Sequence, residues 1–210
     1  MAHNNARNIR TKKSSFELIN NVFYDFKFAA GFSSGQDWTA IGNHWKKGVT
    51  SIRSNDITSY ITDDAHGHTG SIYHSNNTND FDVKFLRSEW ESYVVGSPPL
   101  NSGIVPKSVS ESISYILENA GARHPYFDPV DQRVIQDYYA NSGKVIDSQM
   151  EVGGYPELDR GTPLMDSDDD GMPDAWEESM GLDLSADDSA GDHDSDGYTN
   201  IEEYLYSFTF

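Results

Sequence analysis

FELINNVFYDF (residues 16–26) decides the fold, because WTAIGNHWKKG (residues 38–48) repeats it at an interval of 22 residues. Ile19-Asn20-Asn21-Val22 aligns with Ile41-Gly42-Asn43-His44, and GSIYHSNNTNDF at 70–81 is a third, less regular copy. These stretches are rich in aromatic and β-branched residues, which strands favour. A period in the low twenties predicts a β-solenoid, in which each coil of the chain stacks on the previous one.

Asparagine recurs within these copies, and asparagines at equivalent positions can hydrogen-bond to one another from coil to coil. The repeat therefore predicts an asparagine ladder along the stack. An ordinary antiparallel meander remains the alternative, because a repeat this short does not by itself fix the strand pairing.

The second half of the chain carries helix signals. SVSESISYILENAGA (108–122) predicts a helix capped by Ser108 or Ser110, and DPVDQRVIQDYYANSGK (128–144) predicts another with Pro129 in its first turn. Residues 82–107, which include GSPPLNSG, predict a loop, and residues 151–163 predict an extended linker.

Charge is distributed unevenly along the chain. Residues 1–50 hold seven Lys and Arg against three Asp and Glu, whereas residues 151–210 hold one Arg against eighteen Asp and Glu. The net charge of −19 argues against nucleic acid as a partner. A basic start and an acidic end predict two different roles.

The acidic end contains two copies of a twelve-residue calcium-loop pattern. In this pattern oxygen ligands occupy positions 1, 3, 5, 9 and 12, the backbone carbonyl of position 7 contributes, and a glycine at position 6 permits a sharp turn. The first loop supplies Asp166, Asp168, Asp170, Met172 through its carbonyl, Asp174 and Glu177, with Gly171 at the turn. The second loop supplies Asp192, Asp194, Asp196, Tyr198, Asn200 and Glu203, with Gly197 at the turn.

The alternative for this segment is a solvated acidic tail. Such a tail has no reason to place glycine sixth and glutamate twelfth in two copies, so we expect Ca²⁺ as the cofactor. AWEESMG and IEEYLYSF, which follow the loops, allow only short helices. The spacing therefore predicts a compact module that bound calcium holds together, and not a calmodulin-like sensor.

Three stretches carry a resemblance to a known family. Residues 166–205 resemble the C-terminal tail of many secreted bacterial polysaccharide lyases, and residues 130–158 resemble what precedes that tail in pectate lyases of polysaccharide lyase family 1. AHNNARNIRTKKSSFELINNVFYDF (2–26) resembles the segment around the Arg-x-Pro-x-x-Arg motif of the same family. The chain therefore resembles the C-terminal half of a family 1 pectate lyase.

The resemblance implies a fold that agrees with the 22-residue period, a right-handed parallel β-helix. We therefore expect an all-β fold, in which residues 1–107 form partial, C-terminal coils of such a β-helix. Residues 108–163 are expected to form a helical extension and linker. Residues 164–210 are expected to form a double EF-hand-like calcium-binding module.

The family's activity is calcium-dependent β-elimination of polygalacturonate or pectin, and the resemblance implies roles for the basic segment. The first arginine of the motif, the base that removes the C5 proton, falls on Arg7. The last arginine, which binds a substrate carboxylate, falls on Lys12, and the proline falls on Ile9. Lys12 keeps the charge but not the bidentate fork, and Arg10 adds to the positive field that attracts a polyanion. A solvated basic terminus is the alternative.

The family's catalytic calcium aspartates and its Trp-Ile-Asp-His motif precede the arginine motif, and no stretch of this chain matches them. We therefore expect a truncated chain with little or no lyase activity alone. Two alternatives are a non-catalytic, dockerin-like or thrombospondin-type-3-like calcium module that recruits a partner and a carbohydrate-binding β-domain. Dockerin loops usually end in Asp, whereas Glu177 and Glu203 end these.

The setting expected from the resemblance is extracellular. No signal peptide is visible in the chain, and we expect it to have been lost with the missing N-terminal part. No apolar run approaches the length of a membrane helix. We expect a secreted monomer that acts on an acidic plant or algal polysaccharide.

Overall fold

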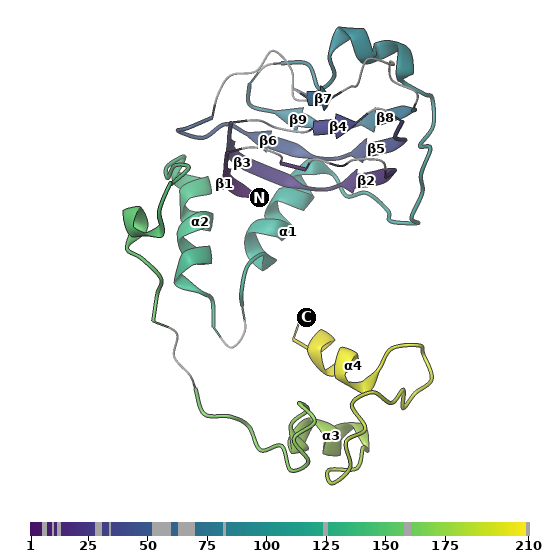
Figure 1. Ribbon diagram of the computed structural model, residues 1–210, viewed down its shortest axis with the longest axis vertical. Coiled ribbons are helices and arrows are strands. Elements are labelled where there is room, and N and C mark those ends of the chain that lie inside the picture. The colour runs from purple at the N-terminus through teal and green to yellow at the C-terminus, as the bar shows by residue number, and fades with distance from the viewer. Residues whose placement is uncertain are drawn as a thin grey trace. The chain divides into compact units, whose positions relative to one another are not determined.

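The computed structural model describes residues 1–5, 8–9, 11, 14–27, 31–33, 35–51, 60–62, 70–81, 83–123, 126–157 and 161–208. The chain forms two compact units, Met1–Pro156 and Glu157–Phe210, which are considered separately below. The strands belong to the first unit, and the acidic loops belong to the second (Figure 1).

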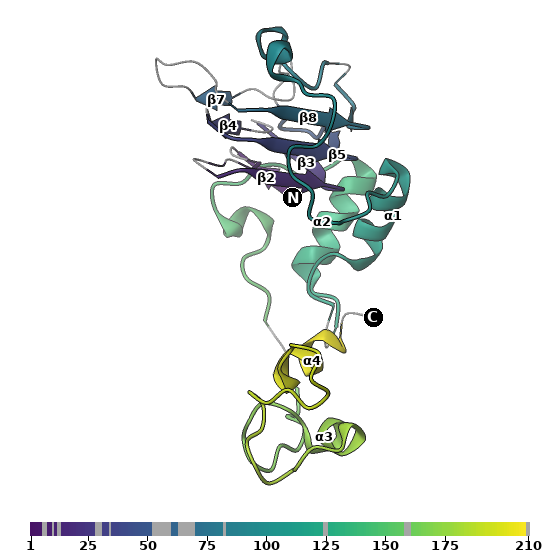
Figure 2. The same ribbon diagram turned by 90° about the vertical axis from the view of Figure 1, so that its right-hand side faces the viewer.

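Three parallel sheets build the first unit. Their strand orders are β1-β3-β6-β9, β2-β5-β8 and β4-β7. Figures 1 and 2 show the strands of successive passes of the chain stacked in layers. The strands are β1 (Ala2–Asn4), β2 (Phe16–Ile19), β3 (Val22–Phe26), β4 (Gly31–Ser33), β5 (Trp38–Ile41), β6 (His44–Lys46), β7 (Tyr60–Thr62), β8 (Ile72–Ser75) and β9 (Thr78–Asn79).

The strand register confirms the 22-residue repeat. Phe16 pairs with Trp38, and Val22 pairs with His44, each in parallel. The third copy also pairs in parallel, since Trp38 is in register with Ile72. The antiparallel alternative is therefore wrong for these strands.

The same bend follows the first strand of each copy. Asn20, Gly42 and Asn76 have φ values of 55°, 66° and 53°. This left-handed backbone conformation is easy for glycine and tolerated best by asparagine among the other residues. The bend explains why these positions hold only those two residue types, and it turns the chain from one sheet into the next.

An asparagine ladder runs through the position after this bend, as the repeat predicted. The side-chain oxygen of Asn43 accepts a hydrogen bond from the backbone N–H of Asn21 at 2.9 Å. The oxygen of Asn77 accepts from the backbone N–H of Asn43 at 3.0 Å and from its side-chain amide at 2.8 Å. The amide of Asn43 also donates to the carbonyl of Leu18 at 2.8 Å. Because Asn43 is fully buried, the ladder satisfies backbone groups that water does not reach.

Removing the central rung should destabilise the first unit. Asn43→Ala removes a partner from the buried carbonyl of Leu18 and from the partly buried backbone N–H of Asn21. We expect a loss of about 3 kcal/mol in the free energy of unfolding, measured by urea denaturation. Asn101→Ala is the matched control, because Asn101 lies on an exposed loop. A loss below about 0.5 kcal/mol for Asn43→Ala would show that the ladder adds no more to the free energy of unfolding than an ordinary surface contact.

Large apolar side chains fill the space between the sheets. The rings of Phe23 and Trp45 stack at 5.0 Å, and Leu18 and Ala40 are neighbours across the β2–β5 pair. The core cluster comprises Leu18, Phe23, Phe26, Trp38, Ala40, Trp45, Ile72, Phe81 and Leu86. This core fixes which residues of each coil face inward.

Two helices cover one side of the stack. Helix α1 (Val109–Asn119) begins with a capping box in which Ser108 and Glu111 bond reciprocally, and α2 (Pro129–Ala140) is capped by Asp128. Both helices were predicted from the sequence. Leu117 of α1 and Tyr138 of α2 pack against Val22 and Tyr24 of β3, and both figures show the helices on this side.

A cluster of hydrogen-bonded polar side chains fastens α2 to the sheet. His3 of β1 contacts Asp25 of β3 through Nδ1 at 2.8 Å and Asp137 of α2 through Nε2 at 3.2 Å. The Asp25 carboxylate is fully buried and also accepts hydrogen bonds from Thr50. The helices are therefore part of the first unit's packing and not an appendage.

The expectation of an all-β fold, with partial coils of a right-handed parallel β-helix, is wrong for this chain. The described residues contain four α-helices, and the strands are only two to five residues long. The remaining helices are α3 (Asp174–Met180), α4 (Asn200–Tyr206) and the 3₁₀ helices η1 (Ser88–Tyr93) and η2 (Gln149–Val152). The sequence repeat identified the strand register correctly, but it said nothing of how much of the chain the helices would occupy.

The second unit consists of the two acidic loops and the short helices α3 and α4. The rings of Trp176 and Tyr204 lie 5.2 Å apart, and the side chain of Met172 is completely buried. Across the described residues, no helix combines the length and the apolar character that a membrane crossing needs.

Candidate metal centre

The first acidic loop is wound around its own carboxylates. The Asp166 carboxylate accepts hydrogen bonds from the backbone N–H of Asp170 at 3.2 Å and of Gly171 at 3.0 Å. The Asp170 carboxylate accepts from the N–H of Met172 at 2.8 Å. Asp169 and Gly171 have positive φ values of 60° and 95°, so the backbone winds tightly here. This winding turns alternate side chains toward the inside of the loop.

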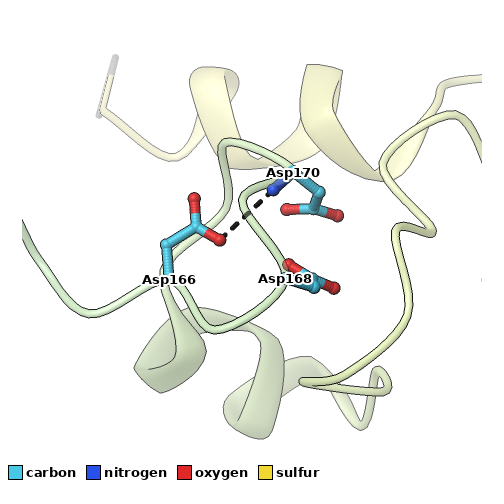
Figure 3. A group of neighbouring side chains, drawn as sticks. All are labelled: Asp166, Asp168 and Asp170. Carbon is cyan, nitrogen blue, oxygen red and sulfur yellow. Dashed lines mark hydrogen bonds between the residues drawn. The ribbon is translucent and has the colours of Figure 1, made fainter.

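Three carboxylates of this loop converge. Asp166, Asp168 and Asp170 each offer an oxygen atom within 4.8 Å of the others, and Figure 3 shows the three side chains gathered in the loop. Calcium–oxygen distances are 2.3–2.6 Å, so two ligands on opposite sides of one ion lie about 5 Å apart. The spacing of these oxygen atoms fits one calcium ion. Burial and the charge of Asp170 raise the pKa of Asp168.

The second acidic loop repeats the first, position by position. Asp192 accepts from the N–H groups of Asp196 at 3.2 Å and of Gly197 at 3.1 Å, and Asp196 accepts from Tyr198 at 2.9 Å. Ser195 and Gly197 have φ values of 65° and 101°. Asp192, Asp194 and Asp196 also bring oxygen atoms within 4.8 Å of one another. Because the two loops share the same hydrogen bonds and carboxylate spacing, we expect them to have the same chemical role.

Glu177, at the twelfth position of the first loop, has the surroundings expected of a cation ligand. Its side chain is fully buried at the start of α3, and both carboxylate oxygens lack a hydrogen-bond partner among the described residues. Burial, together with the charges of Asp168, Asp170, Asp188 and Asp174, raises the pKa of Glu177 to about 7. A buried carboxylate without a donor is costly, and a divalent cation removes both the repulsion and the missing contacts.

Glu203 occupies the same position in the second loop. Burial and the charges of Asp194, Asp196 and Asp192 raise its pKa. The three aspartates of this loop are exposed, whereas those of the first loop are partly buried. The second site is therefore more open to water than the first.

The residues at position 9 brace their loops. Asp174 accepts hydrogen bonds from the N–H and the hydroxyl of Ser167, both at 2.7 Å. The side-chain oxygen of Asn200 accepts from the N–H of His193 at 3.0 Å. In both loops position 9 thus bonds to position 2 and closes the loop on itself. The two position-7 residues differ, because Met172 is buried and Tyr198 is 62% exposed.

Asp188 was not predicted from the sequence. It lies outside both twelve-residue patterns, yet its carboxylate comes within 4.8 Å of oxygens of Asp170 and Glu177. No spacing rule identifies such a residue, because only the folding of the segment between the loops brings it to the site.

The basic candidates Arg7, Arg10 and Lys12 lie outside the described residues. Two residues between them are packed into the first unit: Asn8 is 1% exposed, and Ile9 packs against the core cluster. The roles assigned to the three basic residues remain predictions.

Curated relatives of the chain are pectate lyases by name. Probable pectate lyase C of Aspergillus fumigatus is 30% identical over 219 residues, which cover 97% of this chain and 50% of the relative. The proteins of the same name from Neosartorya fischeri and Aspergillus oryzae are each 29% identical, over 97% of this chain and 50% and 51% of their own lengths. The chain thus spans about half the length of the curated relatives it matches. No family model matches the chain.

The expected similarity to pectate lyases is confirmed by these relatives. The similarity extends over nearly the whole chain and recurs in several relatives that carry one name.

Proposed function

We propose that this chain is part of a polysaccharide lyase that cleaves polygalacturonate or pectin by β-elimination with calcium, and that its acidic end binds calcium for structural stability. The similarity to proteins named pectate lyase is the observation that carries the proposal. The two matching acidic loops are the observation that carries the structural calcium.

Residues 1–107 contribute to the polysaccharide site in this proposal, residues 108–163 support them, and residues 164–210 bind calcium. Arg7 is the proposed base. It takes the proton from C5 of a uronate residue, the C4–O4 bond breaks with its electron pair on the glycosidic oxygen, and a C4=C5 double bond forms. The released oxygen then takes up a proton, so one chain becomes two without water being consumed.

Lys12 and Arg10 are the proposed contacts for substrate carboxylates. Their charges, together with that of Lys13, favour the partly neutral state that a basic arginine needs. Calcium bound by the uronate carboxylate would stabilise the negative charge that builds as the proton leaves.

The two acidic loops have a structural role in this proposal. Their calcium ions neutralise carboxylates that otherwise repel one another, and they fasten α3 and α4 to the loops. The residues that bind them are those of the two loop patterns. A secreted, monomeric protein would meet enough calcium outside the cell to keep both loops filled.

The lyase activity has a direct test. The longest natural polypeptide that carries this chain is mixed with polygalacturonate and calcium, and the ultraviolet absorbance of the unsaturated product is followed. We expect the absorbance to rise with calcium and not with chelator present. Binding of the polysaccharide without any rise in absorbance would favour a carbohydrate-binding module and overturn the proposed activity.

A further inference from the structure

A second carboxylate cluster overlaps the first loop. Asp170, Glu177 and Asp188 each offer an oxygen within 4.8 Å of the others. Asp170 also belongs to the cluster with Asp166 and Asp168, so the two clusters share a member. Asp188 thus lies beside a site whose other residues all come from the loop pattern.

Unpartnered oxygens mark this place independently of the cluster. Both oxygens of the buried Glu177 and Oδ2 of Asp170 lack a hydrogen-bond partner within the part of the chain that the structure describes. Protein donors satisfy nearly all such buried oxygens in folded proteins, so their absence here indicates a cation as the partner.

The second loop holds Asp188 in position. The Asp188 carbonyl accepts hydrogen bonds from the Asn200 side-chain amide at 2.8 Å and from the N–H of Gly191 at 2.7 Å. Asn200 also donates its backbone N–H to the carbonyl of Gly191 at 2.8 Å, and Ile201 donates to that of Ser189 at 3.1 Å. The turn that carries Asp188 is therefore fastened to the start of α4.

This turn is also tightly packed. A Cβ atom at Gly191 would lie 2.9 Å from the Asp188 carbonyl oxygen and 3.2 Å from the Asn200 side-chain nitrogen. The side chain of Asn200 is 2% exposed, so this contact is shielded from water. The second loop and the turn that carries Asp188 are therefore packed closely together.

We propose that Asp188 is a ligand of the calcium ion in the first loop, supplied from outside that loop and held in place by the second. This inference rests on the proposed calcium binding. It adds a sixth carboxylate to the five of the first loop pattern, whereas the second loop pattern has four, so the first site has more negative charge than the second and binds calcium more tightly. It also makes the two sites dependent on each other, because filling the second loop orders a ligand of the first.

The test is a calcium titration of the full chain, followed by NMR. The amides of Gly171 and Gly197 donate to Asp166 and Asp192, so each reports on its own loop. For Asp188→Asn we expect the calcium affinity of the first loop to fall by about tenfold or more. Asp187→Asn is the matched control, since it removes the same charge from an exposed neighbour and should leave both affinities unchanged.

A second variant tests the coupling. Glu203→Gln weakens the second loop directly, and we expect the first loop to lose affinity as well, by a few-fold. An unchanged first loop in Asp188→Asn, in a chain whose wild type fills both loops, would overturn the ligand role. A third ion in the wild type that only Asp188→Asn removes would also overturn it. No calcium at either loop in the wild type would instead refute the proposed calcium binding.

Discussion

Glu177→Gln should nearly abolish calcium binding by the first loop. The substitution keeps the shape of the side chain but removes the charge and one of the two oxygens that the twelfth position supplies. We expect the calcium affinity to fall by at least about 100-fold, or about 2.7 kcal/mol, in a calorimetric titration of the full chain. The second loop should still bind.

In the absence of calcium, the same substitution should make the folded chain more stable. Glu177 is buried with no partner for either oxygen, so the neutral amide removes an uncompensated charge and should stabilise the calcium-free chain. Glu178→Gln provides the control, because Glu178 is the exposed neighbour on the same helix. If Glu177→Gln left calcium affinity unchanged, the first loop could not be a calcium loop of the proposed kind.

Arg7→Ala should remove most of the proposed lyase activity of a protein that contains this chain. Loss of a general base typically slows turnover by about 100-fold or more. Since the base acts on the reacting proton, kcat should fall while KM changes little. Lys12→Ala should show the reverse, a higher KM with a smaller change in kcat, because its proposed role is to bind a substrate carboxylate.

Lys84→Ala controls for the loss of a positive charge from the first unit, since the side chain of Lys84 is 68% exposed. It should leave both constants unchanged. Turnover of Arg7→Ala at the wild-type rate, in a variant that is folded, would remove Arg7 from the catalytic site. The proposal would then require another base.

The strand register could be predicted from the sequence because it depends on the residue types at a few positions in each copy. The bend at Asn20, Gly42 and Asn76 needs residues that accept positive φ, and the following position needs an amide for the ladder. In the sequence both requirements recur 22 residues apart between the first two copies and 34 residues further on in the third. The two acidic loops could be recognised for the same reason, because all positions of each pattern, including the turn glycine, lie within twelve consecutive residues.

Contacts between distant segments could not be predicted in this way. His3 meets Asp137 only because α2 packs against β1 and β3. Asp188 reaches the first loop only because Asn200 fixes its turn. The all-β prediction failed for a related reason: the helices were recognised one by one, but their share of the packed unit depends on the apolar contacts of Leu117 and Tyr138 with β3.

The number of calcium ions bound by the full chain tests the central structural claim most directly. Native mass spectrometry of the chain, titrated with calcium and then with chelator, counts the ions without assuming a binding model. Two ions are predicted for the wild type, and one is predicted for Glu177→Gln at a calcium concentration that still fills the second loop. A wild type that binds no calcium under conditions in which it is folded would contradict the claim.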